Sequence, residues 1–113
     1  MVARNTLLTA IPYPVEQALR TVGNNLRTAR LRRKLTIEET AQKIGTGARA
    51  VRGAESGKAS TGVAVYAALL WAYGLLSPLE TLADPQNDQE GLALAGLAAN
   101  ARARRSKGPD NDF

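Results

Sequence analysis

The chain has none of the residues that most catalytic and metal sites use. Its 113 residues contain no cysteine and no histidine, and only 4% of them are aromatic. Without thiols there is no disulfide and no thiolate nucleophile. Without imidazoles there is neither the commonest zinc ligand nor the commonest general base. We therefore expect a protein that is not an enzyme and holds no metal or cofactor, with a core built from aliphatic side chains.

Long hydrophobic runs are also missing. The most apolar stretch, residues 64–76, is shorter than the ~18 residues needed to span a bilayer, and turn residues lie on both sides of it. The N-terminal region shows no secretory apolar segment followed by a cleavage site. We expect no membrane association and a cytoplasmic, nucleoid-associated protein.

Positive charge is abundant and unevenly distributed. The net charge is +5, but residues 20–58 alone hold ten Lys or Arg against three Glu, a local charge of +7. A basic block in a nearly neutral chain predicts a polyanionic partner. The alternative is a solvated basic face, which is the commoner explanation for a charge run considered alone.

Within this block the sequence predicts two short helices joined by a glycine-containing turn. Thr36 and Glu39 have the spacing of a capping box, which starts a helix. Gly45 can adopt the left-handed conformation that ends this helix after Ile44. A second short helix follows at once. This is the arrangement of a helix-turn-helix, whose second helix enters the major groove of DNA.

These residues carry a family resemblance. With LTIEETAQKIG at 35–45 and AESG at 54–57, the chain resembles the XRE family of phage-repressor and Cro-like proteins. The resemblance covers roughly residues 20–83. It implies an all-α, five-helix lambda-repressor-like domain that binds an inverted-repeat operator as a homodimer. The QKIG ending and the chain length further resemble HipB-like antitoxins, which implies autoregulation and a HipA-like kinase toxin as partner.

The expected organisation is an N-terminal arm at 1–14, a DNA-binding domain at 15–84 and a C-terminal tail at 85–113. A first helix starts near Val15, with a kink or a break at 23–25. We expect Ser60 or Thr61 to cap the fourth helix.

The fourth helix is expected to end at Gly74, and a short fifth helix to run from Ser77 to about Ala83. The tail has an Ala/Leu-rich part at 88–100 that can form a short helix, then a basic run. We expect the tail to be partly helical or disordered.

The resemblance places base contacts at Ala48, Arg49 and Gly53, with Arg52 beside them. Arginine suits guanine because its fork donates to O6 and N7 together, although both arginines could instead contact phosphate alone. The full expected DNA interface is Arg49, Arg52, Ala48, Gly47, Gly53, Arg32, Arg33, Lys43 and Lys58.

The chain departs from the family pattern at three positions of the helix-turn-helix. Ile37 replaces a frequent Gln, Gly47 replaces a polar N-cap, and Gly53 lies inside a helix at a cost of about 1 kcal/mol. Three explanations stay open. The backbone could approach DNA closely, DNA shape could be recognised more than bases, or DNA binding could be weak and protein binding the main role.

Other residues are expected to act outside the DNA interface. By resemblance, Arg30 and Glu55 form an ion pair that locks the first helix to the recognition helix. Trp71 falls off the face that Tyr66 and Tyr73 share, so it is a candidate for a dimer or partner surface, as are Leu94, Leu97 and Phe113 of the tail.

The sequence thus predicts a dimeric, sequence-specific transcriptional repressor, most simply the antitoxin of a HipBA-type toxin–antitoxin system. One alternative is a stand-alone XRE regulator. Another is a degenerate XRE domain that binds only protein.

Overall fold

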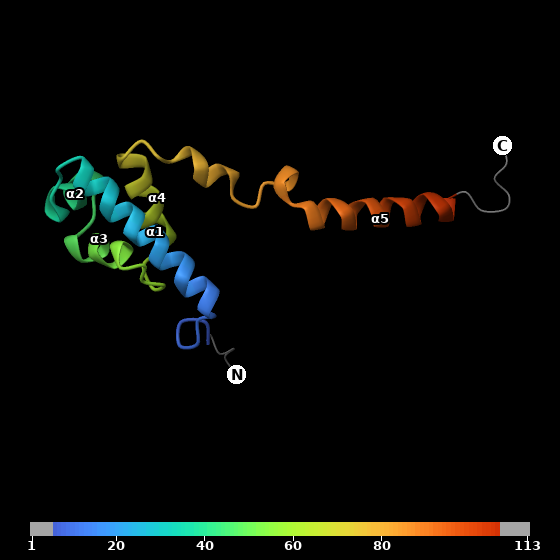
Figure 1. The fold of residues 1–113 in the computed structure, drawn as a ribbon, viewed down its shortest axis with the longest axis horizontal. Helices are drawn as coiled ribbons and strands as arrows, with labels where there is room; N and C mark the ends of the chain where they lie inside the picture. The colour runs from blue at the N-terminus through green and yellow to red at the C-terminus, as the bar shows by residue number, and fades with distance from the viewer. Residues whose placement is uncertain (1–5, 107–113) are drawn as a thin grey trace. The chain divides into compact units, whose positions relative to one another are not determined.

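A computed structural model describes residues 6–106, and these residues form only helices, turns and irregular segments. The predicted all-α class is confirmed for this part of the chain (Figure 1). The α-helices are α1 (Tyr13–Arg32), α2 (Ile37–Ile44), α3 (Ala48–Glu55), α4 (Val63–Ala72) and α5 (Gln89–Ser106). Two 3-10 helices are η1 (Ser77–Thr81) and η2 (Pro85–Asn87). None of the described helices has the length and hydropathy that crossing a membrane requires.

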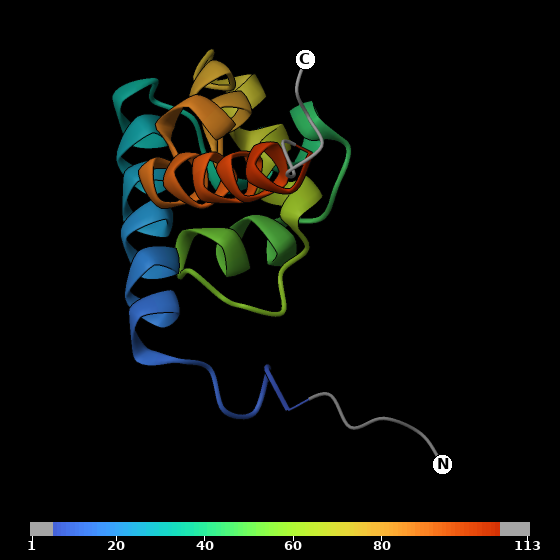
Figure 2. The same ribbon diagram turned by 90° about the vertical axis from the view of Figure 1, so that its right-hand side faces the viewer.

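The chain divides into two compact units after Leu76. In the first unit α3 packs against α1, α2 and α4, and α2 also packs against α4 (Figures 1 and 2). The second unit contains η1, η2 and α5, and α5 contacts η2. The expected domain boundary at residue 84 falls within the second unit, in which η1 buries none of its residues and Leu82 is 68% exposed.

The core of the first unit is small and mostly aliphatic. Leu26 of α1, Val51 of α3 and Leu69 of α4 are almost fully buried. Tyr66 and Tyr73 are buried as well and belong to this core. Each such side chain removed from water contributes roughly 1.5–3 kcal/mol. Three helices therefore share one apolar centre, and this centre holds α3 in place.

Helix α1 is continuous from Tyr13 to Arg32, so the expected break at 23–25 is wrong. Gly23 makes room for a close contact with the end of α3. A Cβ on Gly23 would lie 2.6 Å from the carbonyl oxygen of Glu55. Gly57 has a φ of 71°, and its Cβ would lie 2.6 Å from the carbonyl oxygen of Leu19. The backbones of α1 and of the turn after α3 are therefore in direct contact, which only glycine permits.

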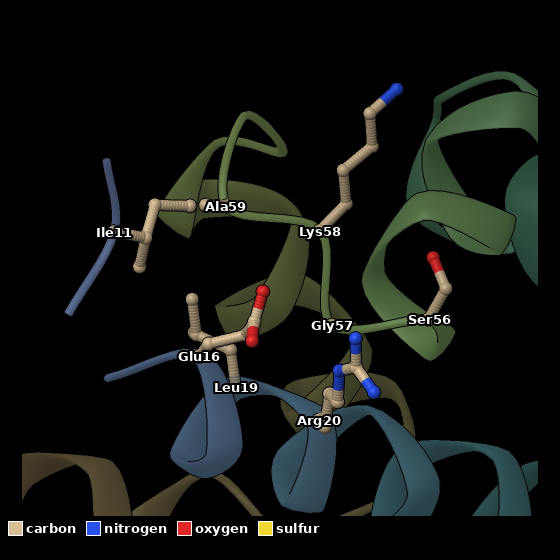
Figure 3. A pocket seen from close by; sticks show the side chains of 8 residues that line it. All are labelled: Ile11, Glu16, Leu19, Arg20, Ser56, Gly57, Lys58 and Ala59. Atoms are coloured by element: carbon tan, nitrogen blue, oxygen red, sulfur yellow. The ribbon is translucent and has the colours of Figure 1, made fainter. Parts of the chain in front are cut away.

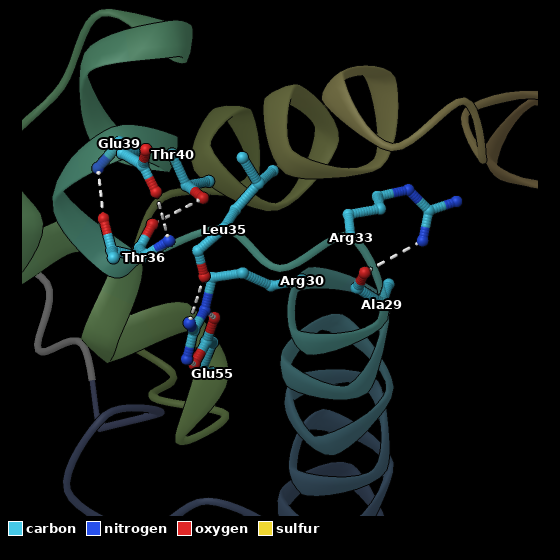
Figure 4. A network of polar contacts seen from close by, with 8 residues as sticks. All are labelled: Ala29, Arg30, Arg33, Leu35, Thr36, Glu39, Thr40 and Glu55. Atoms are coloured by element: carbon cyan, nitrogen blue, oxygen red, sulfur yellow. Dashed lines mark hydrogen bonds and ion pairs between the residues drawn. The ribbon is translucent and has the colours of Figure 1, made fainter.

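Helix α2 begins and ends where the sequence predicts. The hydroxyl of Thr36 accepts a hydrogen bond from the N–H of Glu39 at 3.0 Å, and the Glu39 carboxylate accepts from the Thr36 N–H at 2.8 Å. Gly45 has a φ of 80° and ends the helix in the left-handed conformation. The capping box, drawn in Figure 4, and the glycine C-cap are both confirmed.

Helix α4 starts later than the sequence predicts. Its N-cap is Gly62, which provides no side-chain hydrogen bond, so neither Ser60 nor Thr61 caps it. Gly74, with a φ of 72°, follows the end of the helix as expected. Helix α4 contains no charged residue over its whole length.

The short fifth helix expected at 77–83 is the 3-10 helix η1, in which the Thr81 hydroxyl donates to the Pro78 carbonyl at 2.8 Å. The α-helix of the second unit is α5, which extends beyond the predicted stretch at 88–100. The Asp88 carboxylate accepts from the Gly91 N–H at 2.9 Å and so caps its start. Alanine, a strong helix former, accounts for much of its length.

Candidate nucleic-acid interface

Helix α3 has a buried face and a charged outward face. Val51, Ala54 and Glu55 are buried, while Arg49 and Arg52 are exposed. A helix turns by 100° per residue, so positions three and four apart share a face. The arginines therefore point away from the core, as the sequence predicts for this helix.

Arg52 leans toward α2 and forms an ion pair there. Its Nη2 lies 3.2 Å from Oε2 of Glu38, and both side chains remain exposed, at 57% and 70%. Sequence analysis missed Glu38 because fourteen positions separate it from Arg52 and no local pattern links the two. Acidic residues are common in the first turn of a helix, where they favour the positive end of the helix dipole. The presence of Glu38 there therefore does not indicate an arginine partner.

Gly53 follows Arg52 and packs against the loop that leads to α4. A Cβ on Gly53 would lie 2.5 Å from Oγ1 of Thr61, so the glycine makes room for this loop. Gly53 is half-buried. Its small size is thus explained by packing within the protein, and it does not by itself indicate close approach of DNA.

A shallow groove of about 460 Å³ lies between α3 and this loop. Arg49 and Lys58 supply positive charge at its edge, and Ser60 and Thr61 supply hydroxyls. Gly47, which also lines the groove, is the N-cap of α3 and has no side-chain acceptor for the first N–H groups of the helix. Cations, hydroxyls and free N–H groups are the donors that phosphate oxygens accept from.

Arg30 and Glu55 form a buried ion pair, as Figure 4 shows. Arg30 donates from Nε to Oε2 at 2.6 Å and from Nη2 to Oε1 at 3.1 Å, and its Nη1 donates to the Leu35 carbonyl at 2.8 Å. The hydrogen bonds to Glu55 raise the pKa of the Arg30 guanidinium. This paired fork joins α1, the end of α3 and the turn before α2.

Arg33 has protein partners where the sequence predicts a phosphate contact. It donates to the carbonyls of Ala29 and Tyr73, at 2.9 Å each, and its guanidinium lies 5.4 Å from the centre of the Tyr73 ring. These contacts satisfy the last carbonyls of α1 and α4. Arg32 and Lys43 are exposed in the last turns of α1 and α2, and within residues 6–106 no hydrogen bond or ion pair engages their side chains.

A second hollow, of about 220 Å³, lies at the loop after α3 and shares Lys58 with the shallow groove beside Arg49. Figure 3 shows Glu16 and Arg20 of α1 pointing into it, opposite Gly57 and Ala59. Lys58 extends away from it. The Glu16 carboxylate disfavours phosphate at this place. The groove beside Arg49 is thus the more favourable site for an anion.

Each of the two units has large exposed apolar side chains that are candidates for partner contacts. Trp71 is 61% exposed and Val63 is 74% exposed, and both belong to the charge-free helix α4. Leu94 and Leu97 are exposed on α5. Phe113 lies outside the described residues.

Comparison with family models, with curated proteins and with solved structures found no match for this chain. The interface itself offers hydrogen-bond donors and positive charge on one face of a short, firmly held helix. Such a face fits a ligand rich in oxygen acceptors, and its arginines fit the acceptor edge of guanine in particular.

Proposed function

We propose that the chain is a sequence-specific DNA-binding repressor in which α2 and α3 form a helix-turn-helix of the XRE type. The observation that carries the proposal is the outward face of α3, where Arg49 and Arg52 lie opposite buried Val51 and Ala54. In this role α3 is the recognition helix, and it enters the major groove, which is wide enough for an α-helix.

The surroundings of α3 support contacts to the DNA backbone. The groove with Lys58, Ser60 and Thr61 lies beside Arg49, so a phosphate bound there places Arg49 over the base edges. Arg32 and Lys43 are available as further phosphate contacts, whereas Arg33 is engaged with Tyr73. Phosphate contacts position the helix and base contacts give specificity.

We further propose that the repressor is a homodimer. Val63, Ala67 and Trp71 follow one another at intervals of four along α4, which places them on one apolar face. A helix that is apolar all round is normally covered on all sides. In a twofold dimer this face contacts its own copy, and an uncharged face does so without repulsion between like charges. A twofold dimer also matches an inverted repeat with half-sites about 34 Å apart.

An autoregulated antitoxin with a HipA-like kinase partner is the specific biological role that we propose. The exposed Leu92, Leu94 and Leu97 of α5 favour a protein partner for the second unit. If α5 binds no protein partner, the alternative is a stand-alone XRE regulator. A domain that binds protein only is the alternative if DNA binding is absent.

The test is a selection of binding sites from a random duplex library, followed by titration of the selected duplex at increasing salt. If each dimer neutralises about six phosphates, log K falls with log salt at a slope near −5. An inverted repeat among the selected sequences supports the proposal. Absence of binding at low salt, or a slope near zero, contradicts it.

A further inference from the structure

We propose that Glu38 is a positioning residue for base recognition, because its carboxylate orients Arg52 across the gap between α2 and α3. This inference rests on the proposed DNA-binding function and specifies how one of its two arginines selects a base. The contact that carries it is the 3.2 Å pair between Nη2 of Arg52 and Oε2 of Glu38.

The geometry leaves Arg52 free to bind a base at the same time. A guanidinium has five N–H donors, and the pair with Glu38 uses a single Nη2 contact. The remaining donors are sufficient for the two acceptors O6 and N7 of guanine. Since Arg52 is 57% exposed while paired, the ion pair does not have to break before the side chain reaches the groove.

Glu38 is itself held by a fixed part of the backbone. It lies in the first turn of α2, directly before Glu39, whose carboxylate is committed to the capping box with Thr36. A negative charge at this end of a helix is favoured by the helix dipole. Of the two adjacent glutamates, one therefore fixes the helix start and the other extends toward Arg52.

This arrangement has two effects of opposite sign on DNA binding. A long arginine side chain that is already ordered loses less conformational freedom on binding, so its preferred base is bound more selectively. The carboxylate also repels phosphate, so all DNA is bound less tightly. Arg49 provides the contrast, because within residues 6–106 no hydrogen bond or ion pair engages its guanidinium.

The experiment compares Glu38→Gln with Glu90→Gln in the full chain. Glu90 lies in the first turn of α5 and is exposed, so this variant changes the net charge equally and leaves α3 untouched. The probes are the duplex selected by the unmodified protein, the same duplex with each guanine replaced in turn, and a random duplex. A melting curve of each variant checks that it is folded.

We expect Glu38→Gln to bind random duplex about two- to threefold more tightly and to lose about five- to tenfold of its preference for guanine at one base pair per half-site. Glu90→Gln is expected to keep that preference. In an Arg52→Ala background, Glu38→Gln is expected to cause no further loss of the guanine preference, because the arginine that the Glu38 carboxylate orients is absent.

The inference is overturned if Glu38→Gln and Glu90→Gln show the same base preferences. It is also overturned if Glu38→Gln sharpens the guanine preference, since the carboxylate then competes with the base for Arg52. A different result, in which the unmodified protein selects no sequence at all, contradicts the proposed function itself and is recognised before any variant is compared.

Discussion

At the residue scale, the two arginine–glutamate pairs found within residues 6–106 differ chiefly in their exposure to water. Arg30 and Glu55 are buried and doubly hydrogen-bonded, whereas Arg52 and Glu38 are exposed and joined by one contact. Removing one partner of a buried pair leaves an uncompensated charge in the interior. Removing one partner of an exposed pair leaves a charge that water solvates.

We therefore expect Glu55→Ala to lower the free energy of unfolding by about 3–5 kcal/mol. The double change Arg30→Met/Glu55→Leu should recover part of this loss, but not all of it, because the Leu35 carbonyl also loses its donor. Urea unfolding of the three proteins measures both effects. A Glu55→Ala midpoint equal to that of the unmodified protein would show that the pair adds nothing to stability.

The Glu39 carboxylate gives the fold a dependence on pH. The hydrogen bond from the Thr36 N–H lowers the pKa of Glu39 below its ordinary value of 4.5. Its contribution to stability is thus fully present above pH 4.5 and is lost as the pH falls through the lowered pKa. We expect the unmodified protein to exceed Glu39→Gln in stability at neutral pH, with a difference that disappears in acid. A constant difference from about pH 3 to about pH 7 would contradict this expectation.

Two helical glycines are expected to respond in opposite ways to alanine. In Gly23→Ala the new Cβ meets backbone oxygens of Ala54 and Glu55, which cannot move aside, so we expect a loss of about 1–3 kcal/mol. In Gly96→Ala of α5 the Cβ meets nothing within 4 Å, so helix propensity alone acts and helicity should increase. Circular dichroism melting curves separate the two, and a Gly23→Ala protein as stable as the original would rule out the close contact.

At the scale of elements, the sequence predicts those features that local signals determine. Helix α2 is bounded by Thr36, Glu39 and Gly45, which act on their own neighbours, and both of its ends were predicted correctly. The start of α4 differs from the prediction. Ser60 and Thr61 are residue types that commonly cap helices, but the fold places both in the loop beside α3, and Gly62 is the N-cap.

Features that depend on distant parts of the chain could not be predicted. The break expected at 23–25 is absent, and Gly23 instead packs against the backbone oxygens of Ala54 and Glu55, which are far away in sequence. Tyr73, one partner of Arg33, and Glu38, the partner of Arg52, lie 40 and 14 positions away. Residue type indicates that an arginine needs acceptors, but only the fold decides which ones it finds.

Under the proposed function we expect different effects from removing a cation of α3 and a cation of the loop that follows it. Arg49→Ala should cost about 1–3 kcal/mol on the selected duplex and relax the preference at one base pair per half-site. Lys58→Ala, in the loop, should weaken binding to all DNA sequences equally. It should also make the slope of log K against log salt shallower by about one unit. Equal losses on selected and random duplex for Arg49→Ala would make Arg49 a phosphate contact only.

At the scale of the whole molecule, the division after Leu76 determines what can be removed. The buried hydrophobic core lies entirely within α1 to α4 and the residue that ends α4. We expect a chain truncated after Leu76 to melt within about 3 °C of the full chain. Under the proposed function it should also keep its affinity for the selected duplex and lose binding to the toxin partner. A fall of the melting temperature by more than about 10 °C would contradict the division.

The contact between Gly23 and the end of α3 has a consequence for how such a protein can diversify. Because this contact joins backbone to backbone, its geometry is independent of the side chains that α3 presents outward. Positions 49 and 52 can therefore be exchanged in the course of evolution without moving the helix on which they stand. Under the proposed function, a lineage that keeps Gly23 and Gly57 can acquire new target sequences one residue at a time and stay folded at every step.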